Sequence, residues 1–231
     1  MKGTILQPTF LPWLGYFEMI HSSDIFVVFD NVQFGKKSWQ HRNKIKTANE
    51  ITNLTVPIKK TPRSTHINKI EISYDHGNPL EKHWSTIEFA YKKAPYFKNY
   101  SKLFESIFKQ NYSTLLELNM NLIQNICNIL KIKTKIVFAS NFIDHFLKNN
   151  KTDNIIELCN SVGIDHLYDA KGASSFLELS KFKDNNIKIE FQEYTHPIYS
   201  QMWGEFVTHL SAMDLIFNEG QNSLDIILNK K

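Results

Sequence analysis

The chain has little cysteine, and its two cysteines do not form a metal-binding or disulfide pattern. Cys127 and Cys159 stand far apart in 231 residues, and each lies in an apolar segment with helical periodicity. Disulfide scaffolds and zinc sites both need several cysteines at characteristic spacings. We therefore expect neither, and we expect Cys127 to pack in a core rather than act as a nucleophile.

Long apolar runs and a strong excess of one charge are also missing. No stretch approaches the roughly 20 apolar residues of a membrane span, and Gln7 and Pro8 interrupt the first apolar stretch, unlike in a secretory signal. The 27 basic and 23 acidic side chains leave a formal charge of +4, too little to indicate general nucleic-acid binding. We expect a soluble, cytoplasmic protein with no membrane partner.

Hydrophobic and aromatic residues are abundant, at 42% and 13% of the chain. This composition supplies a core and excludes a largely disordered chain. Because domains usually contain about 100 to 200 residues, we expect a single domain over residues 1–231.

Strand-like and helix-like segments alternate along the chain. The sequence predicts strands at residues 2–6 and 23–30 with a short helix between them, which indicates a parallel βαβ unit. A hairpin ending near residue 58 and a strand at 67–73 follow, and then a mostly helical insertion at about 78–131, where Ser113 is a plausible cap. Further strands are expected at 135–140, 165–170 and 187–194, with a helix at 152–163 capped by Thr152 or Asp153 and another from about residue 173. The alternation predicts an α/β fold with a parallel-sheet, Rossmann-like core.

The stretch "QPTFLPWLG" at residues 7–15 follows the first predicted strand. Ligands of open parallel sheets bind at the carboxyl ends of the strands. Gly15 would permit a close backbone approach, and the start of the following helix would favour an anion. The alternative is that Trp13 and its neighbours simply pack under the sheet. On the first interpretation Gln7, Trp13, Gly15 and Tyr16 bind substrate.

The segment "QPTFLPWLGYFEMIHSSDIFVVFDNVQFGKKSWQHRNKI" resembles the opening signature of the WbqC-like family of bacterial surface-polysaccharide gene clusters. The later blocks "LYDAKGASSFLE" and "LSAMDLIFNEG" are similar to that family too, so the resemblance covers nearly the whole chain. It implies an enzyme of O-antigen or lipopolysaccharide biosynthesis that transfers an N-acyl or aminoacyl group, such as glycyl, to a nucleotide-linked amino sugar.

The same turn is also similar to the first turn of HIGH-superfamily nucleotidylyltransferases, which have a HUP-type core. Gly15 keeps the register, whereas Trp13 and Tyr16 stand where that superfamily has histidines, and "GASSFL" falls where it has a second phosphate-binding turn. This likeness implies a nucleotide pocket that includes Ser174 and Ser175. The alternative functions are therefore an ATP-dependent ligase, a nucleotidylyltransferase-like enzyme, and a non-catalytic nucleotide-sugar or aminoacyl-tRNA binding protein.

The densest polar cluster is "FDNVQFGKKSWQHRNKIK". Its basic side chains suit phosphate, which arginine binds bidentately and lysine as a point charge; the alternative is a solvated basic loop. The expected substrate-binding residues here are Gln33, Lys37, Trp39, Arg42 and Asn43. His41 is the expected base, because the histidine pKa lies near neutrality, and Asp30 would orient it or bind the amine.

Three later residues complete the predicted site. Tyr199, Gln201 and Asp214 either form a structural pair or cap within the core or close over the same pocket as residues 7–16. The sequence leaves the cofactor open between ATP and an activated amino-acid donor.

Overall fold

The computed structural model describes residues 1–143 and 150–230, which divide into two compact units. The sheet unit contains residues 1–8, 18–32 and 133–195, and the helix-rich unit contains residues 9–17, 33–132 and 196–231. Helix α1 (Leu14–His21) is divided between them.

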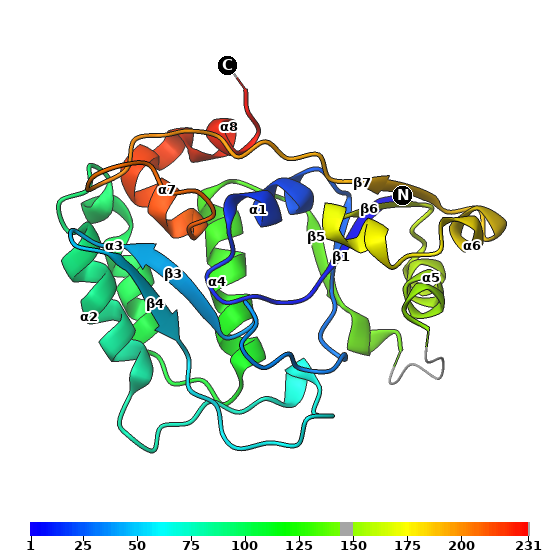
Figure 1. Ribbon diagram of the computed structural model, residues 1–231, viewed down its shortest axis with the longest axis horizontal. Helices are drawn as coiled ribbons and strands as arrows, with labels where there is room; N and C mark the ends of the chain where they lie inside the picture. Colours follow the sequence, from blue (N-terminus) through cyan, green and yellow to red (C-terminus); the bar gives the residue numbers. More distant parts are fainter. Residues whose placement is uncertain (144–149, 231) are drawn as a thin grey trace. The chain divides into compact units, whose positions relative to one another are not determined.

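The sheet unit is built on five parallel strands (Figure 1). Its strand order is β5-β2-β1-β6-β7, and every neighbouring pair is parallel. All four residues of β2 are buried, as expected for a strand covered on both faces of its sheet. The strands are β1 (Lys2–Leu6), β2 (Ile25–Val28), β5 (Lys135–Phe138), β6 (His166–Asp169) and β7 (Lys188–Phe191). The predicted α/β class with a parallel, Rossmann-like core is confirmed.

The strand order creates a switch point in this sheet. Counted in chain order within the sheet unit, the strands run third, second, first, fourth, fifth, which is the arrangement of Rossmann-type sheets. The order reverses between β1 and β6, so the carboxyl ends of these two strands form the edge at which open sheets bind ligands. Gln7 follows β1 there, and Asp169 is the last residue of β6.

Helices α5 (Lys151–Val162) and α6 (Leu179–Asp184) pack against each other in this unit, and α6 also contacts β7 (Figure 1). Asn150 caps α5 instead of the expected Thr152 or Asp153, because its side chain accepts from both of their backbone N–H groups. Gly163 ends α5 as expected, with a φ of 79°. The helix expected after β6 is interrupted: a 3₁₀ turn, η3 (Lys171–Ser175), precedes α6, and another, η2 (Ala139–Asn141), follows β5.

The helix-rich unit combines a hairpin with helices. Strands β3 (Arg42–Lys46) and β4 (Ile51–Thr55) pair antiparallel, which confirms the expected hairpin. The helical segment expected at about 78–131 contains α2 (Pro79–Tyr91), α3 (Phe97–Lys109) and α4 (Leu115–Ile129). The C-terminal part adds α7 (Ala212–Glu219), η4 (Gly220–Asn222) and α8 (Ser223–Ile227).

Two expectations about this unit are wrong. Residues 67–73 do not form a strand: a 3₁₀ turn, η1 (Ile67–Lys69), begins the segment, and isolated β-bridges at Glu71 and Ile72 follow it. The buried residues Ile67 and Ile70 have the spacing of a turn, whereas Ile70 and Ile72 alternate as in a strand. Thr114, not Ser113, caps α4, in a capping box with Glu117.

The core of the helix-rich unit is aromatic. Phe217 of α7 contacts Tyr91, Phe97 and Phe104 of α2 and α3, with ring centroids 5.4, 5.0 and 5.3 Å away. Cys127 is buried on α4, and burial raises the pKa of its thiol to about 12, which keeps it protonated. Across the described residues, none of the helices combines the length and apolarity that a membrane crossing requires.

Candidate functional site

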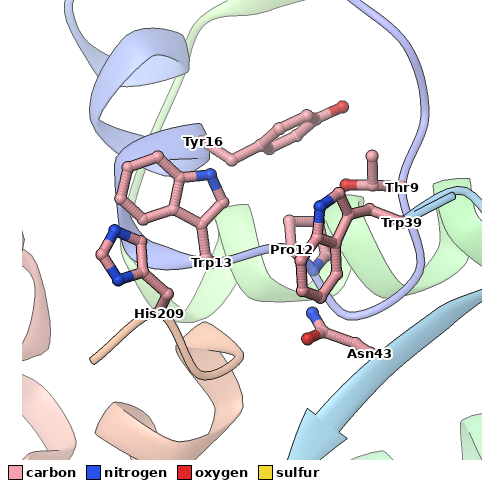
Figure 2. A pocket seen from close by; sticks show the side chains of 7 residues that line it. All are labelled: Thr9, Pro12, Trp13, Tyr16, Trp39, Asn43 and His209. Carbon is pink, nitrogen blue, oxygen red and sulfur yellow. The ribbon is translucent and has the colours of Figure 1, made fainter. Parts of the chain in front are cut away.

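A cavity of about 180 Å³ lies within the helix-rich unit (Figure 2). Its lining is largely aromatic, and we call it the aromatic cavity. The lining residues are Thr9, Pro12, Trp13, Tyr16, Trp39, Asn43 and His209. Four of the residues predicted from sequence, Trp13, Tyr16, Trp39 and Asn43, therefore come together in one place.

Trp13 is held by stacking on two histidines. Its ring lies 5.1 Å from the His209 ring at 30° and 6.4 Å from the His196 ring at 14°. Its benzo ring also occupies the space over Gly15: a Cβ at that glycine would lie 2.3 Å from Cη2 of Trp13. The glycine thus makes room for the indole, rather than for the backbone approach considered from sequence.

The backbone of this loop is tied to the start of α7. Trp13 forms an isolated β-bridge with Ser211, and the Ala212 N–H donates to the Pro12 carbonyl at 2.8 Å. Ser211 in turn caps α7 by accepting from the Met213 N–H. The helix start therefore fixes one wall of the cavity.

Trp39 forms the wall across from Trp13, with Tyr16 above them in the view of Figure 2. Trp39 is 57% exposed, so part of its indole is accessible to a ligand. The turn that carries it is well held, because the buried Gln40 accepts from the Gly35 N–H at 2.9 Å and the Trp39 carbonyl accepts from the Phe10 N–H at 2.9 Å.

Asn43 lies at the lower edge of the cavity in the view of Figure 2 and makes hydrogen bonds to the backbone beside it. Its Nδ2 donates to the carbonyls of Phe10, at 3.3 Å, and Leu11, and its Oδ1 accepts from the Lys44 N–H at 2.7 Å. Leu11 has a φ of 49°, a left-handed conformation that is rare for leucine. Asn43 is therefore a positioning residue that holds this unusual backbone.

The imidazole and phenol groups around the cavity differ in what they can do. His196 Nδ1 donates to the Pro197 carbonyl at 2.8 Å, and Nε2 accepts from the His209 N–H at 3.1 Å, an arrangement that requires a neutral ring. Burial, with a smaller effect of His209, lowers the pKa of His196 accordingly. Burial raises the pKa of Tyr16 well above its usual value, so its phenol stays protonated. His209 is the imidazole that lines the cavity itself.

Other predicted residues of the basic loop lie outside the aromatic cavity. Arg42 is exposed and adjoins the buried Asn43 on β3, so the two side chains face opposite sides of the strand. His41 packs edge-on against Phe34, with ring centroids 5.3 Å apart, and burial lowers its pKa. Gln33 and Lys37 are exposed.

Tyr199, Gln201 and Asp214 form a polar network in the helix-rich unit. The Asp214 carboxylate accepts from the hydroxyls of Tyr91 and Tyr199, each at 2.7 Å, and Gln201 Nε2 donates to the Tyr199 hydroxyl at 3.1 Å. Lys46 Nζ donates to Gln201 Oε1 at 3.3 Å. Burial raises the pKa of Asp214 despite these donors. The contacts correspond to the structural alternative, and none of the three predicted residues lines the aromatic cavity.

The remaining predicted residues belong to the sheet unit. The Asp30 carboxylate accepts from the Ser140 N–H at 3.0 Å and from its hydroxyl at 2.7 Å, so it fixes the loop after β5. Ser174 and Ser175 are exposed on η3, where their hydroxyls donate to carbonyls of the same turn. Gln7 is exposed after β1.

Sequence reasoning missed four residues of interest. Thr9 and Pro12 lie inside the quoted stretch but carried no chemical signal of their own. His209 precedes the Ser211 cap of α7 by two residues, and that cap pattern is the one signal that places it at a helix start. Asp169 ends β6 at the switch point, and burial raises its pKa to about 6.

The similarity of this chain to known proteins extends over both units. The profile of the WbqC-like protein family matches residues 7–226. A similar protein is "Uncharacterized protein Rv1507c" of Mycobacterium tuberculosis, which is 30% identical over 228 residues, 98% of this chain and 97% of that protein. No solved structure matches the chain. The likeness to HIGH-superfamily nucleotidylyltransferases stays a prediction.

Proposed function

The chain belongs to the WbqC-like protein family, and from this membership and the aromatic cavity we propose that it is an N-acyl or aminoacyl transferase acting on a nucleotide-linked amino sugar. The expected pathway is O-antigen or other surface-polysaccharide biosynthesis, and glycyl is the expected group. The aromatic cavity is the observation that carries the proposal.

The size and lining of the cavity favour a ring. Pockets that enclose a whole drug-sized ligand measure roughly 300 to 1,000 Å³, whereas this one measures about 180 Å³. It therefore suits a single ring system, with the rest of the ligand outside. The exposed indole of Trp39 offers a surface on which a nucleobase or a sugar ring stacks, and Trp13 forms the opposite wall.

The proposed chemistry is formation of an amide. The amine nitrogen of the sugar attacks the carbonyl carbon of an activated aminoacyl donor, which is an ester, thioester or adenylate. The bond to the leaving group breaks with its electron pair, and the amine loses a proton. His209 lines the cavity, and a neutral imidazole can accept that proton. The roles predicted from the sequence stay predictions: His41 as the base, and Asp30 as the group that orients it or binds the amine.

The test combines binding with product analysis. The protein is incubated with UDP- and dTDP-linked amino sugars, together with glycine and ATP or with glycyl-tRNA, and mass spectrometry looks for an added glycyl group. Trp39→Ala should weaken nucleotide-sugar binding about five- to 150-fold, since stacking on an aromatic side chain is worth about 1 to 3 kcal/mol.

Phe89→Ala is the matched control. Phe89 lies on α2 and is 69% exposed, but it does not line the aromatic cavity, so its loss should leave binding unchanged. If Trp39→Ala and Phe89→Ala bind the nucleotide sugar equally well, the cavity is not the binding site. If no donor yields a glycylated product, the assignment of glycyl as the transferred group fails.

An ATP-dependent ligase is the second candidate, and the sheet unit favours it. The Rossmann-type strand order with its switch point between β1 and β6 is a common nucleotide site. This function predicts glycine-dependent exchange of pyrophosphate into ATP in the absence of any sugar. Absence of that exchange, with glycyl transfer from tRNA intact, would remove it.

A further inference from the structure

A second cavity of about 250 Å³ also lies within the helix-rich unit. Two loop segments form it, one before the hairpin and one after it. Its lining residues are Gln33, Phe34, Gly35, Lys36, Pro62 and Arg63. We call it the basic cavity, because the charged residues of its lining are Lys36 and Arg63.

The surrounding segment is strongly cationic. Residues 33–69 contain nine lysine or arginine side chains and a single acidic one, Glu50, although the whole chain has a net charge of only +4. Lys59 is neutralised by Glu71 at 2.6 Å. Within the described part of the chain, neither Lys36 nor Arg63 makes an ion pair, so both charges are available to a ligand.

The walls of the basic cavity are fixed by backbone contacts. The buried Phe34 donates its N–H to the Thr65 carbonyl at 2.9 Å, and Gln33 forms a β-bridge with His66. The Thr65 N–H in turn donates to the Pro62 carbonyl at 3.2 Å. These contacts join the two loop segments, so the cations stand on a preorganised frame rather than on independent loops.

We propose that the basic cavity binds a pyrophosphoryl group. Arginine presents a planar fork that matches phosphate oxygens, and lysine adds a point charge, so the pair suits a polyanion with several oxygens. Phe34 and Pro62 add apolar surface to the lining beside the two cations. Anion binding at this place does not depend on the function proposed above.

A link between the two cavities rests on that proposed function. Residues 35–40 form one turn, with Gly35 and Lys36 in the basic cavity and Trp39 in the aromatic cavity. A nucleotide sugar has a ring system and a pyrophosphate within one molecule. It would therefore place its diphosphate at Lys36 and Arg63 while one ring stacks at Trp39.

The test is calorimetric titration of the full chain with inorganic pyrophosphate at low ionic strength. Arg63→Gln and Lys36→Gln should each weaken binding about tenfold or more, because each removes a charge-assisted contact. Lys60→Gln is the matched control: Lys60 is an exposed cation of the same loop and does not line the cavity, so its loss should change affinity less than about twofold.

Each outcome decides the assignment. Absence of pyrophosphate binding by the unaltered protein, or an equal loss in Lys60→Gln, overturns it, since a general basic field would then be sufficient. Binding of tRNA without binding of pyrophosphate also overturns it, in favour of a nucleic-acid surface. Trp39→Ala should weaken nucleotide-sugar binding and leave pyrophosphate affinity unchanged. If pyrophosphate binds as expected and no donor gives a glycylated sugar, the anion site stands and the glycyl-transfer function fails.

Discussion

Gly15 provides a sharp test of how the aromatic cavity is built. An added Cβ would lie 2.3, 2.5 and 2.8 Å from three atoms of the Trp13 benzo ring. To restore an ordinary contact of 3.4 Å, the indole must move by about 1.1 Å in Gly15→Ala. His209 and His196 stack on the same indole and resist that movement.

The magnitude follows from two opposing effects. Overpacking of this kind costs about 1 to 3 kcal/mol, whereas replacing a helical glycine by alanine stabilises by about 0.5 to 1 kcal/mol. We expect Gly15→Ala to lower the free energy of unfolding by up to about 2.5 kcal/mol. Nucleotide-sugar affinity should fall as well, because the displaced indole changes the shape of the cavity wall.

A double-mutant comparison isolates the cause. In a Trp13→Ala background the clash is gone, so Gly15→Ala should become stabilising by about 0.5 to 1 kcal/mol in urea unfolding. Gly172→Ala is the control, since a Cβ at Gly172 meets nothing within 4 Å. If Gly15→Ala has the same sign with and without Trp13, the glycine does not serve to seat the indole.

Two further predictions concern pH. Burial lowers the pKa of His83 to about 4 from 6.5, so between these pH values the unfolded chain binds a proton that the folded chain excludes. The free energy of unfolding should therefore fall by about 3 kcal/mol between pH 6.5 and 4. Urea unfolding should show a smaller fall in His83→Gln and the wild-type fall in the control His76→Gln, where an exposed ring is replaced. Burial raises the pKa of Asp169 to about 6 from 3.8, so its charge destabilises the fold above pH 6 and is relieved as the pH falls. Asp169→Asn should therefore add up to about 3 kcal/mol at pH 8 and nothing below pH 3.8, and an equal effect at both would refute the burial argument.

The parallel sheet could be predicted because its signals are local. The apolar run that contains β2 indicated a strand buried on both faces, and the alternation with helices indicated parallel connections. The prediction of a strand at 67–73 was wrong because the isoleucines of this segment satisfy both a strand pattern and a turn pattern. Only the contacts of the folded chain choose between the two.

The cavity was predictable in part for the same reason. Trp13, Tyr16 and Trp39 stood out as aromatic residues in unusual stretches of sequence. His209 lies about 200 residues after Trp13 in the chain, and its stacking on that indole is a long-range contact that no local pattern reports. The seating of the indole over Gly15 is likewise a matter of side-chain geometry, which composition and spacing do not contain.

The backbone beside the aromatic cavity contains residues in a conformation that side chains other than glycine rarely adopt. Leu11, Lys37 and His209 have φ values of 49°, 61° and 59°, and residues other than glycine seldom adopt this region. Each such residue costs of order 1 to 3 kcal/mol. Leu11 precedes the lining residue Pro12, Lys37 lies two residues before the lining residue Trp39, and His209 is itself a lining residue. Lys131, Asn186, Trp203 and Asn229 also have positive φ and do not line the cavity, so the conformation itself is not special to this place. What distinguishes Leu11 is its support, because the buried Asn43 side chain donates to the Leu11 carbonyl and holds the backbone beside Pro12 and Trp13.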